Sequence, residues 1–419
     1  MNKLIQVKLS AMMFLEFFVW GAWYTVISVY MTKHGMENLA QWPFTANAIA
    51  AIAAPFFVGL IADRYFATEK VLGTLHILGA VFMFLTPLAT GNPLIFILLL
   101  FAYNLCYMPT MSLANTLAFH NMEDQEKQFP IIRVFGTIGW IVAGLVISFV
   151  LGIFVAESVV PEETALPLYL TSGASLLFGL YSFTLPHTPP PAKGEKVSIR
   201  SITGVDAFKV LGSRSFYIFL FSSLLICIPL QAYYIYTPVF MGNTGFENIA
   251  ATLTIGQMSE AFFMVLIPVL FVRWGVKWML GVGMLAWVAR YALFALGAPA
   301  EVTWMIIAGI ALHGICYDFF FVTGQIYVDK KATADIRGQA QGLIVLVTYG
   351  VGMFIGAQIA GAVYNSFLGD VGRLTLQQWQ EFWWIPAIFA GAVFVFFMIF
   401  FNDRVIAEGE DVSEADIKV

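Results

Sequence analysis

Charged residues are scarce in this chain of 419 residues, at 11 % of the total, whereas 60 % of the residues are hydrophobic. An average soluble domain carries about 25 % charged residues. A soluble fold could not bury this much apolar surface, so we expect a lipid bilayer to surround the protein. The few charges stand in short clusters between long apolar runs, and no nucleic-acid partner is expected.

Cysteines and catalytic motifs are also rare or absent. Cys106, Cys227 and Cys316 each lie in an apolar run without metal-ligand or redox spacing, so we interpret them as small core residues. The sequence has no Walker A loop, which excludes transport driven by ATP. It has neither H-E-x-x-H nor G-x-S-x-G, so we expect no enzyme activity, no metal and no cofactor.

Long apolar runs fill most of the chain. Crossing about 30 Å of hydrocarbon takes roughly 20 apolar residues in a helix, which predicts an all-α integral membrane protein with twelve transmembrane helices. Polar residues interrupt the tenth and eleventh runs. The expected spans are 9–31, 42–62, 71–90, 93–119, 130–153, 167–185, 215–240, 250–272, 277–297, 302–328, 338–366 and 382–401.

The positive charges give the expected orientation. Of the 21 Lys and Arg, only Lys33 and Arg373 fall in loops expected outside, and only Arg133 and Arg290 fall within spans. By the positive-inside rule, both termini and the hydrophilic segment 186–213 should be cytoplasmic. That segment separates six spans from six, which suggests a duplicated unit. The expected domains are an N-terminal six-helix bundle (1–185), the linker (186–213), a C-terminal six-helix bundle (214–402) and a tail (403–419).

A short motif follows the second run, with Gly59, Asp63 and Arg64 in the segment G-L-I-A-D-R. Gly59 would let two helices approach closely, and the two charges could hold one conformation closed at the cytoplasmic end. An ordinary loop with two solvated charges is the alternative. The motif resembles the G-x-L-x-D-R loop of the major facilitator superfamily. That resemblance implies its fold, two six-helix halves, and a role in conformational gating for these three residues.

Further segments appear in order along nearly the whole chain. They are 14–17 and 20–23, 107–110, 129–133 and 136–140, 256–260, 289–291, 313–314, 317–319 and 327–331. Together they resemble the nucleoside:proton symporter family of this superfamily, in particular the branch whose members are assigned as nucleoside transporters by sequence alone. The resemblance implies proton-coupled nucleoside uptake in a bacterial cytoplasmic (inner) membrane.

Ionisable groups inside a span are costly and usually functional. Gln257 and Glu260 are three residues apart in the eighth span and therefore share a helix face. An amide and a carboxylate on one face can bind vicinal hydroxyls such as those of a ribose, and a buried carboxylate can also take up a proton. A structural ion pair of Glu260 with Arg133 or Arg290 is the alternative. The resemblance implies that the amide and carboxylate line the nucleoside site.

Arg133, Thr137 and Trp140 lie on one face of the fifth span, and we expect this polar stripe to face a cavity. The family places its matching residues against the nucleoside, although Arg133 could instead extend to the membrane surface. Gln231 and Tyr234 share a face of the seventh span. Gln231 matches a ligand-binding amide of the family, whereas Tyr234 replaces a second amide and leaves the choice of substrate open.

The tenth span carries His313, Tyr317 and Asp318. His313 and Tyr317 are four residues apart and stack on one face, and Asp318 is turned by about 100° from Tyr317. His313 departs from the aromatic residue found in the better-known symporters. It could donate to the substrate, relay protons or fill space. Asp318, Glu260 and Glu16 of the first span are the candidates for proton coupling, and Glu16 could instead be a structural partner of a facing helix. We expect Arg290 to be structural.

The predicted function is proton-coupled uptake of nucleosides by alternating access, with the substrate near the bilayer midplane and the protein a monomer. A proton symporter for a sugar, glycoside or other polyhydroxylated solute is the alternative within transport. A polytopic membrane enzyme or a receptor derived from a transporter is the alternative in another class. The missing catalytic motifs oppose the enzyme, and the lack of an extra domain opposes the receptor.

Overall fold

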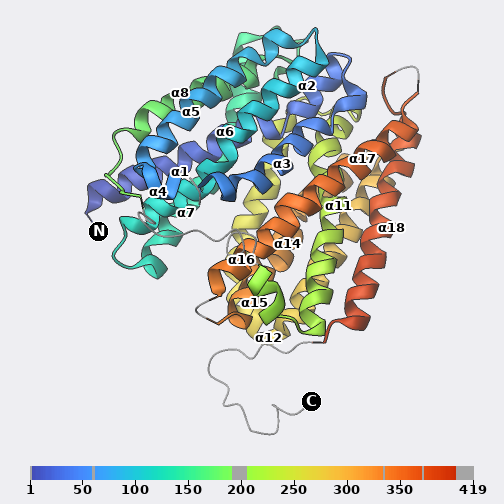
Figure 1. Ribbon diagram of the computed structural model, residues 1–419. Helices are drawn as coiled ribbons and strands as arrows, with labels where there is room; N and C mark the ends of the chain where they lie inside the picture. Colours follow the sequence, from blue (N-terminus) through green and yellow to red (C-terminus); the bar gives the residue numbers. More distant parts are fainter. Residues whose placement is uncertain (1, 59–61, 191–204, 334–335, 370–371, 403–419) are drawn as a thin grey trace.

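The computed structural model describes residues 2–58, 62–190, 205–333, 336–369 and 372–402, with only the backbone described at 63, 126, 205 and 206 (Figure 1). All regular structure in these residues is helical. The predicted Gly59 lies outside the described residues, as do most of the linker and the C-terminal tail, and the side chain of Asp63 is not described. The gating role of the loop motif therefore stays a prediction.

One group of helices comes from the first part of the chain. It comprises α1 (Lys3–Tyr24), α2 (Ile27–Lys33), η1 (Glu37–Leu39), α3 (Trp42–Phe57), α4 (Asp63–Tyr65), α5 (Thr68–Leu85), η3 (Pro87–Ala89), α6 (Pro93–His120), α7 (Gln125–Leu145), η4 (Val146–Val150), η5 (Leu151–Phe154), η6 (Pro161–Glu163) and α8 (Leu166–Ser182).

A second group follows. It comprises α10 (Val205–Val210), α11 (Arg214–Asn243), α12 (Ile249–Gly297), α13 (Thr303–Ala311), α14 (His313–Tyr317), η7 (Asp318–Val322), α15 (Thr323–Lys331), α16 (Arg337–Val345), η8 (Leu346–Gly352), α17 (Met353–Phe367) and α18 (Leu376–Phe400).

Polar side chains mark where several of these helices begin. Asn2, Asn92, Asp124 and Ser213 each accept a hydrogen bond from a main-chain N–H in the first turn of α1, α6, α7 and α11. Thr375 forms a reciprocal capping box at the start of α18. Such caps satisfy N–H groups that have no partner within the helix, which fixes where the long apolar segments start.

The twelve expected spans are confirmed by the fold. In the described residues, nine helical stretches are long and apolar enough to cross a bilayer. One of them, α12, holds two spans, because Gly275 has a positive φ of 69° in the middle of it and breaks the helix in the loop predicted there. The shorter α3 and α8, of 16 and 17 residues, provide the remaining two.

The two spans with polar interruptions contain π-helical turns. The tenth span changes from α14 to the π-helical η7 at Asp318, and the eleventh contains the π-helical η8. A π turn adds one residue to a helical turn and is frequent at functional sites. These turns change the direction of the side chains that follow them, which simple helical periodicity could not predict.

Packing separates the two groups. In the first, α1 packs on α7 and α8, and α5 on α6 and α8; in the second, α12 packs on α14 and α18, and α11 on α17 and α18. The groups meet where α3 contacts α17, α7 contacts α12, and α2 contacts α11 (Figure 1). The central helices of both groups therefore supply the residues between the halves.

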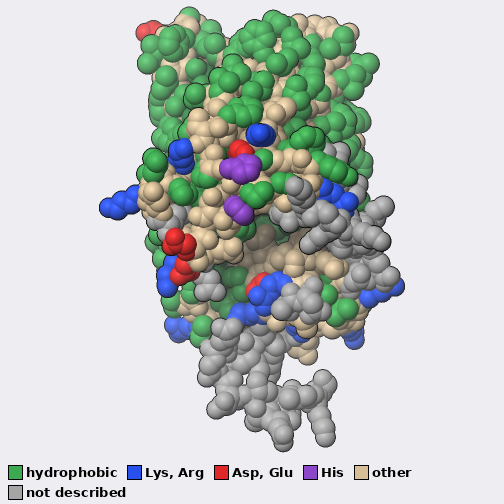
Figure 2. Space-filling view, turned by 60° about the vertical axis from the view of Figure 1, so that its left-hand side comes forward, with side chains coloured by type: hydrophobic (Ala, Val, Ile, Leu, Met, Phe, Trp, Pro, Cys, Tyr) green, Lys and Arg blue, Asp and Glu red, His purple; other side chains and the backbone are tan. Residues whose placement is uncertain are grey.

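The outer surface agrees with a membrane protein. In the face shown in Figure 2, hydrophobic side chains cover most of the upper part, and charged side chains gather in the lower part. Large exposed apolar residues such as Leu94, Phe154, Val265 and Ile388 lie on α6, η5, α12 and α18. Such broad exposed apolar surface is stable only against hydrocarbon.

Hydrogen bonds across the halves lie at the end that the positive charges predict to be external. Glu162 Oε1 accepts hydrogen bonds from Ser148 Oγ at 2.6 Å and from the main-chain N–H of Ala250 at 3.0 Å, at the start of α12. Gln358 Nε2 donates to Thr45 Oγ1 at 2.6 Å. These contacts join α17 to α3 and α12 to the first group, so the halves are held together at this end.

Candidate substrate and proton sites

Glu260 lies on α12 where both halves contribute polar groups. Its side chain is 18 % exposed, and its Oε2 lies 4.0 Å from Nε2 of His313. It interacts electrostatically with Arg133 on α7 and with Asp318 on η7. It also interacts electrostatically with the hydroxyls of Tyr234, Tyr317 and Tyr349. The structure thus brings together the carboxylate and cation that the sequence placed on separate spans.

Arg290 sets the state of His313. It is fully buried on α12, its Nε donates to the carbonyl of Gly309 at 3.0 Å, and an Nη lies 3.1 Å from Nδ1 of His313. A guanidinium can only donate, so Nδ1 of His313 must accept, and the imidazole is neutral with its proton on Nε2. That N–H faces Glu260. Arg290 was expected to be structural, and here it also orients a site residue.

Aromatic rings close the space between the halves. The ring of Tyr234 lies 5.6 Å from that of Tyr24, and the ring of Trp140 lies 6.2 Å from Tyr24, so α1, α7 and α11 meet there. A cavity of about 20 Å³ remains, enough for about one water molecule. It is lined by Thr25, Trp140, Tyr233, Tyr234, Pro238, Leu253 and Gln257. Small-molecule pockets measure roughly 300–1,000 Å³, so these rings must separate to admit a solute.

Two amides have buried, unsatisfied oxygens, and of the two Gln257 lines the cavity whereas Gln231 does not. Oε1 of Gln257 and Oε1 of Gln231 are buried and accept no hydrogen bond from the described residues. Gln231 is 1 % exposed, and its side chain interacts with the hydroxyl of Tyr24 on α1. Buried polar atoms without a partner are uncommon, because each one loses its hydration. Both oxygens are therefore free to accept hydrogen bonds from a bound solute.

Arg133 and Thr137 lie on the same face of α7, both half-buried. The guanidinium carbon of Arg133 lies 4.1 Å from the ring centre of Phe17, and the charge interacts with Glu260. Arg133 therefore faces the interior rather than the membrane surface. No specific contact of Thr137 distinguishes it, so its part in the site stays a prediction.

Asp318 has a carboxylate without hydrogen-bond partners in the described residues. It is fully buried, and neither of its carboxylate oxygens has a hydrogen-bond partner there. The neighbouring Tyr317 is hydrogen-bonded through its hydroxyl to that of Tyr349 on η8. A charged carboxylate without partners is strongly disfavoured in such a place.

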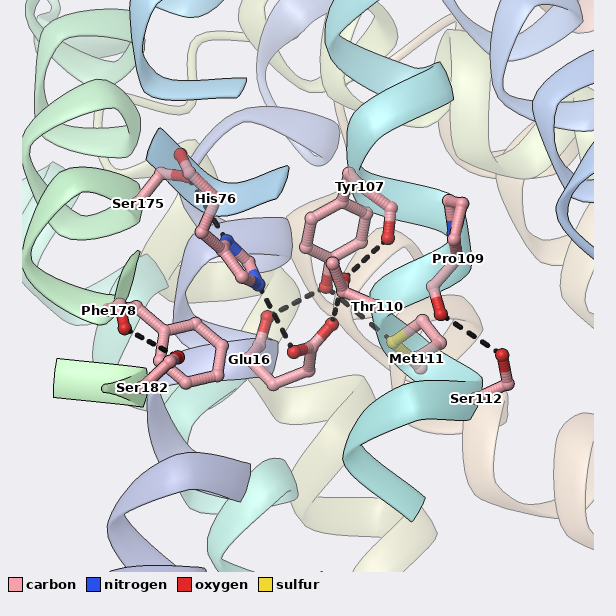
Figure 3. Close-up of polar contacts among 10 residues, drawn as sticks. All are labelled: Glu16, His76, Tyr107, Pro109, Thr110, Met111, Ser112, Ser175, Phe178 and Ser182. Carbon is pink, nitrogen blue, oxygen red and sulfur yellow. Dashed lines mark hydrogen bonds and ion pairs between the residues drawn. The ribbon is translucent and has the colours of Figure 1, made fainter. Parts of the chain in front are cut away.

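Glu16 lies in a second polar cluster, among α1, α5, α6 and α8 (Figure 3). Thr110 Oγ1 donates to its Oε1 at 2.7 Å, and Nε2 of His76 lies 3.4 Å from its Oε2. Ser175 contacts the other nitrogen of His76 at 3.1 Å. Glu16 therefore has the partner on facing helices that one alternative predicted, and that partner is itself titratable.

Sequence reasoning missed three residues that the structure places in these clusters, namely His76, Tyr24 and Tyr349. His76 carried a usable signal, because it is an ionisable residue within the predicted span 71–90. Tyr24 and Tyr349 carried none, since nothing local separates them from the other aromatic residues. A larger hollow of about 390 Å³ between α1 and α8 is lined only by apolar residues and glycine and offers no polar group to a solute.

Twelve helices in two halves, with carboxylates, amides and aromatic rings between them, define a secondary transporter of the major facilitator superfamily. The family model for the nucleoside H+ symporters matches residues 2–405, so the chain belongs to this family. This confirms the family expected from the sequence. The family and the relatives below are transporters rather than enzymes.

Proteins of similar sequence or structure match this chain along nearly its whole length. YegT of Escherichia coli (strain K12) is 40 % identical over 402 residues, covering 94 % of this chain and 93 % of YegT. A crystal structure of the nucleoside transporter NupG is 28 % identical, has a TM-score of 0.83, and covers 96 % of this chain and all of that chain. The maltose permease of Geobacillus stearothermophilus is 25 % identical over 393 residues, covering 92 % of this chain and 89 % of the permease.

Proposed function

We propose that this protein takes up nucleosides together with protons by alternating access. The observation that carries the proposal is the position of Glu260, which lies between the halves with Arg133, Asp318 and the Nε2–H of His313 around it. Membership of the nucleoside H+ symporter family and the similarity to NupG support the choice of substrate.

The side chains divide into two proposed roles. Gln231, Gln257 and Glu260 bind the ribose hydroxyls and polar base atoms, since two of them have free buried acceptors. Trp140, Tyr234 and Tyr317 stack on the base, and His313 donates a hydrogen bond to the substrate from Nε2. Arg133 and Thr137 complete the lining of the substrate site. Glu260, Asp318 and Glu16 carry the coupling proton.

The movement follows from the contacts between the halves. Glu162 and Gln358 hold them together at the predicted external end. These hydrogen bonds break when the halves, 1–185 and 214–402, rock to expose the site outward. We place both termini in the cytoplasm, the protein as a monomer in a bacterial inner membrane, and Gly59, Asp63 and Arg64 as the cytoplasmic gate.

The test is accumulation in vesicles. Purified protein in proteoliposomes should concentrate labelled uridine or adenosine when the outside is acidic, and a proton ionophore should abolish this accumulation. Each coupled proton supports about tenfold accumulation for a gradient of one pH unit. Accumulation that survives the ionophore but requires sodium would overturn proton coupling.

A sugar symporter is the second candidate. The similarity to a maltose permease supports it, and amides, carboxylates and aromatic rings suit sugars as well as nucleosides. Competition separates the two, because unlabelled maltose should leave uridine uptake unchanged if the substrate is a nucleoside. Uptake of labelled maltose without uptake of any nucleoside would replace the first proposal with the second.

A further inference from the structure

Glu16 and His76 form an acid–base pair that is closed off from solvent. Glu16 on α1 is fully buried and His76 on α5 is 2 % exposed, with Nε2 of His76 3.4 Å from Oε2 of Glu16 (Figure 3). No Lys or Arg in the described part of the chain forms an ion pair with Glu16. Among the described residues, His76 is therefore the group within ion-pair distance that could carry a countercharge to this carboxylate.

Ser175 on α8 determines which nitrogen of His76 carries its proton. Its hydroxyl donates to the main-chain carbonyl of His76 at 2.9 Å, and its oxygen lies 3.1 Å from Nδ1 of the same residue. A hydroxyl has one proton to donate, so when Ser175 donates to this carbonyl its oxygen accepts from Nδ1–H. In neutral His76, Nε2 is then a bare lone pair that faces the carboxylate.

Two acceptors at this distance repel each other unless a proton lies between them. We propose that Glu16 and His76 together bind one exchangeable proton, and that this proton is taken up and released during the transport cycle. The proton bonds either to Oε2 of Glu16, leaving His76 neutral, or to Nε2 of His76, leaving an ion pair. The cycle role rests on the proposed proton-coupled transport, whereas the binding of the proton does not.

Thr110 on α6 fits both states of the carboxylate. Its Oγ1 lies 2.7 Å from Oε1 of Glu16 and 2.5 Å from the main-chain carbonyl of Tyr107. When Glu16 is charged, the hydroxyl donates to it. When Glu16 is protonated at Oε2, Oε1 remains an acceptor for the same hydroxyl. The Thr110 hydroxyl therefore serves Oε1 in both states, without movement of a helix.

The ionisable groups that face the pair come from two further helices. Tyr103 and Tyr107 on α6 interact with Glu16, and the Tyr107 hydroxyl donates to the main-chain carbonyl of Glu16 at 2.7 Å. Arg133 on α7 interacts with Tyr107. α8 presents Ser175 and the ring of Phe178, which are not titratable. Tyr107 and Arg133 thus connect this pair to the surroundings of Glu260.

The binding of a proton by Glu16 and His76 can be tested without a substrate. Infrared difference spectra of the purified full-length chain during a pH titration should show a carboxyl band and an imidazole band that change at one shared midpoint, because coupled groups titrate as a pair. Glu16→Gln should remove the carboxyl change and displace the imidazole change. An unaltered carboxyl band in Glu16→Gln, or two independent midpoints in the wild type, would overturn the proposal.

A matched pair of substitutions at Thr110 covers the case in which Glu16→Gln does not fold. Thr110→Ser keeps the hydroxyl, and Thr110→Val keeps the shape but removes it. The midpoint should stay in place for Thr110→Ser and move for Thr110→Val. Equal midpoints in the two variants would refute the role of the hydroxyl in satisfying both states.

Transport measurements test the cycle. In proteoliposomes, two quantities are compared for each variant: substrate accumulation driven by a pH gradient, and substrate exchange without a gradient. If one coupled proton is lost, the ratio of accumulation to exchange should fall in Glu16→Gln and His76→Gln by about tenfold per pH unit of gradient. Glu247→Gln, at an exposed loop position, is the control and should leave the ratio unchanged. An unchanged ratio in both pair variants would overturn the cycle role. A wild type that shows the shared titration but transports no nucleoside would instead refute the proposed function.

Discussion

Replacing Glu260 with glutamine is the most direct test of the site between the halves. The substitution keeps the size of the side chain and removes its charge and its titration. The carboxylate lies 4.0 Å from His313 Nε2, too far for a short hydrogen bond, and is 18 % exposed. We therefore expect Glu260→Gln to fold with nearly unchanged stability, because no well-formed ion pair is broken.

The effect on binding should be much larger. A hydrogen bond to a charged group contributes about 1.5–3 kcal/mol, so the loss of the charge should weaken nucleoside binding roughly tenfold to a hundredfold. The assay is a titration of uridine and adenosine against purified wild type and variant, by calorimetry or by the shift in thermal unfolding. A ligand at a hundred times its Kd stabilises the native state by about 2.7 kcal/mol, which such a shift detects.

The control and the refuting result are both clear. Glu247→Gln removes one carboxylate from an exposed loop and should bind nucleosides like the wild type. If Glu260→Gln also binds them like the wild type, then Glu260 contacts no part of the substrate. If binding falls while accumulation falls only in proportion, Glu260 is a ligand for the substrate and the coupling proton is carried elsewhere.

The remaining predictions concern an amide, a buried cation and the topology. Gln257→Ala should weaken nucleoside binding by about 0.5–1.5 kcal/mol, the usual contribution of a neutral hydrogen bond; calorimetry measures the loss, and wild-type affinity would contradict the contact. Arg290→Lys should lower nucleoside affinity and alter the pH profile of binding, because an ammonium lacks the forked guanidinium that contacts both Gly309 and His313. Wild-type binding in this variant would contradict the role of Arg290 in orienting His313. In intact cells, an impermeant thiol reagent should label a cysteine placed at Lys33 and not one at Lys209, both exposed positions, and the reverse result would invert the topology.

Much of the fold could be predicted because each membrane span depends mainly on its own stretch of sequence. Each span must satisfy its own backbone hydrogen bonds and present apolar side chains to lipid, so a run of about 20 apolar residues predicts its position. The same rule made Glu16, Glu260 and Asp318 conspicuous, since an ionisable residue in such a run is costly. Gln257 and Glu260 could be placed on one face, because three residues fix a direction on a helix.

Only the tertiary structure decided which groups face one another. Glu16 meets His76 and Thr110, 60 and 94 positions away, and nothing in those sequence segments gives the rotation of α1 against α5 and α6. Arg290 reaches His313 because the second half of α12 packs on α14, and the π turn at Asp318 then shifts the side chains that follow. The sequence by itself determined the membrane helices, the family and the list of costly polar residues. Their pairing, and hence the side on which each histidine holds its proton, depended on helix packing, which arises from contacts distributed over the whole protein.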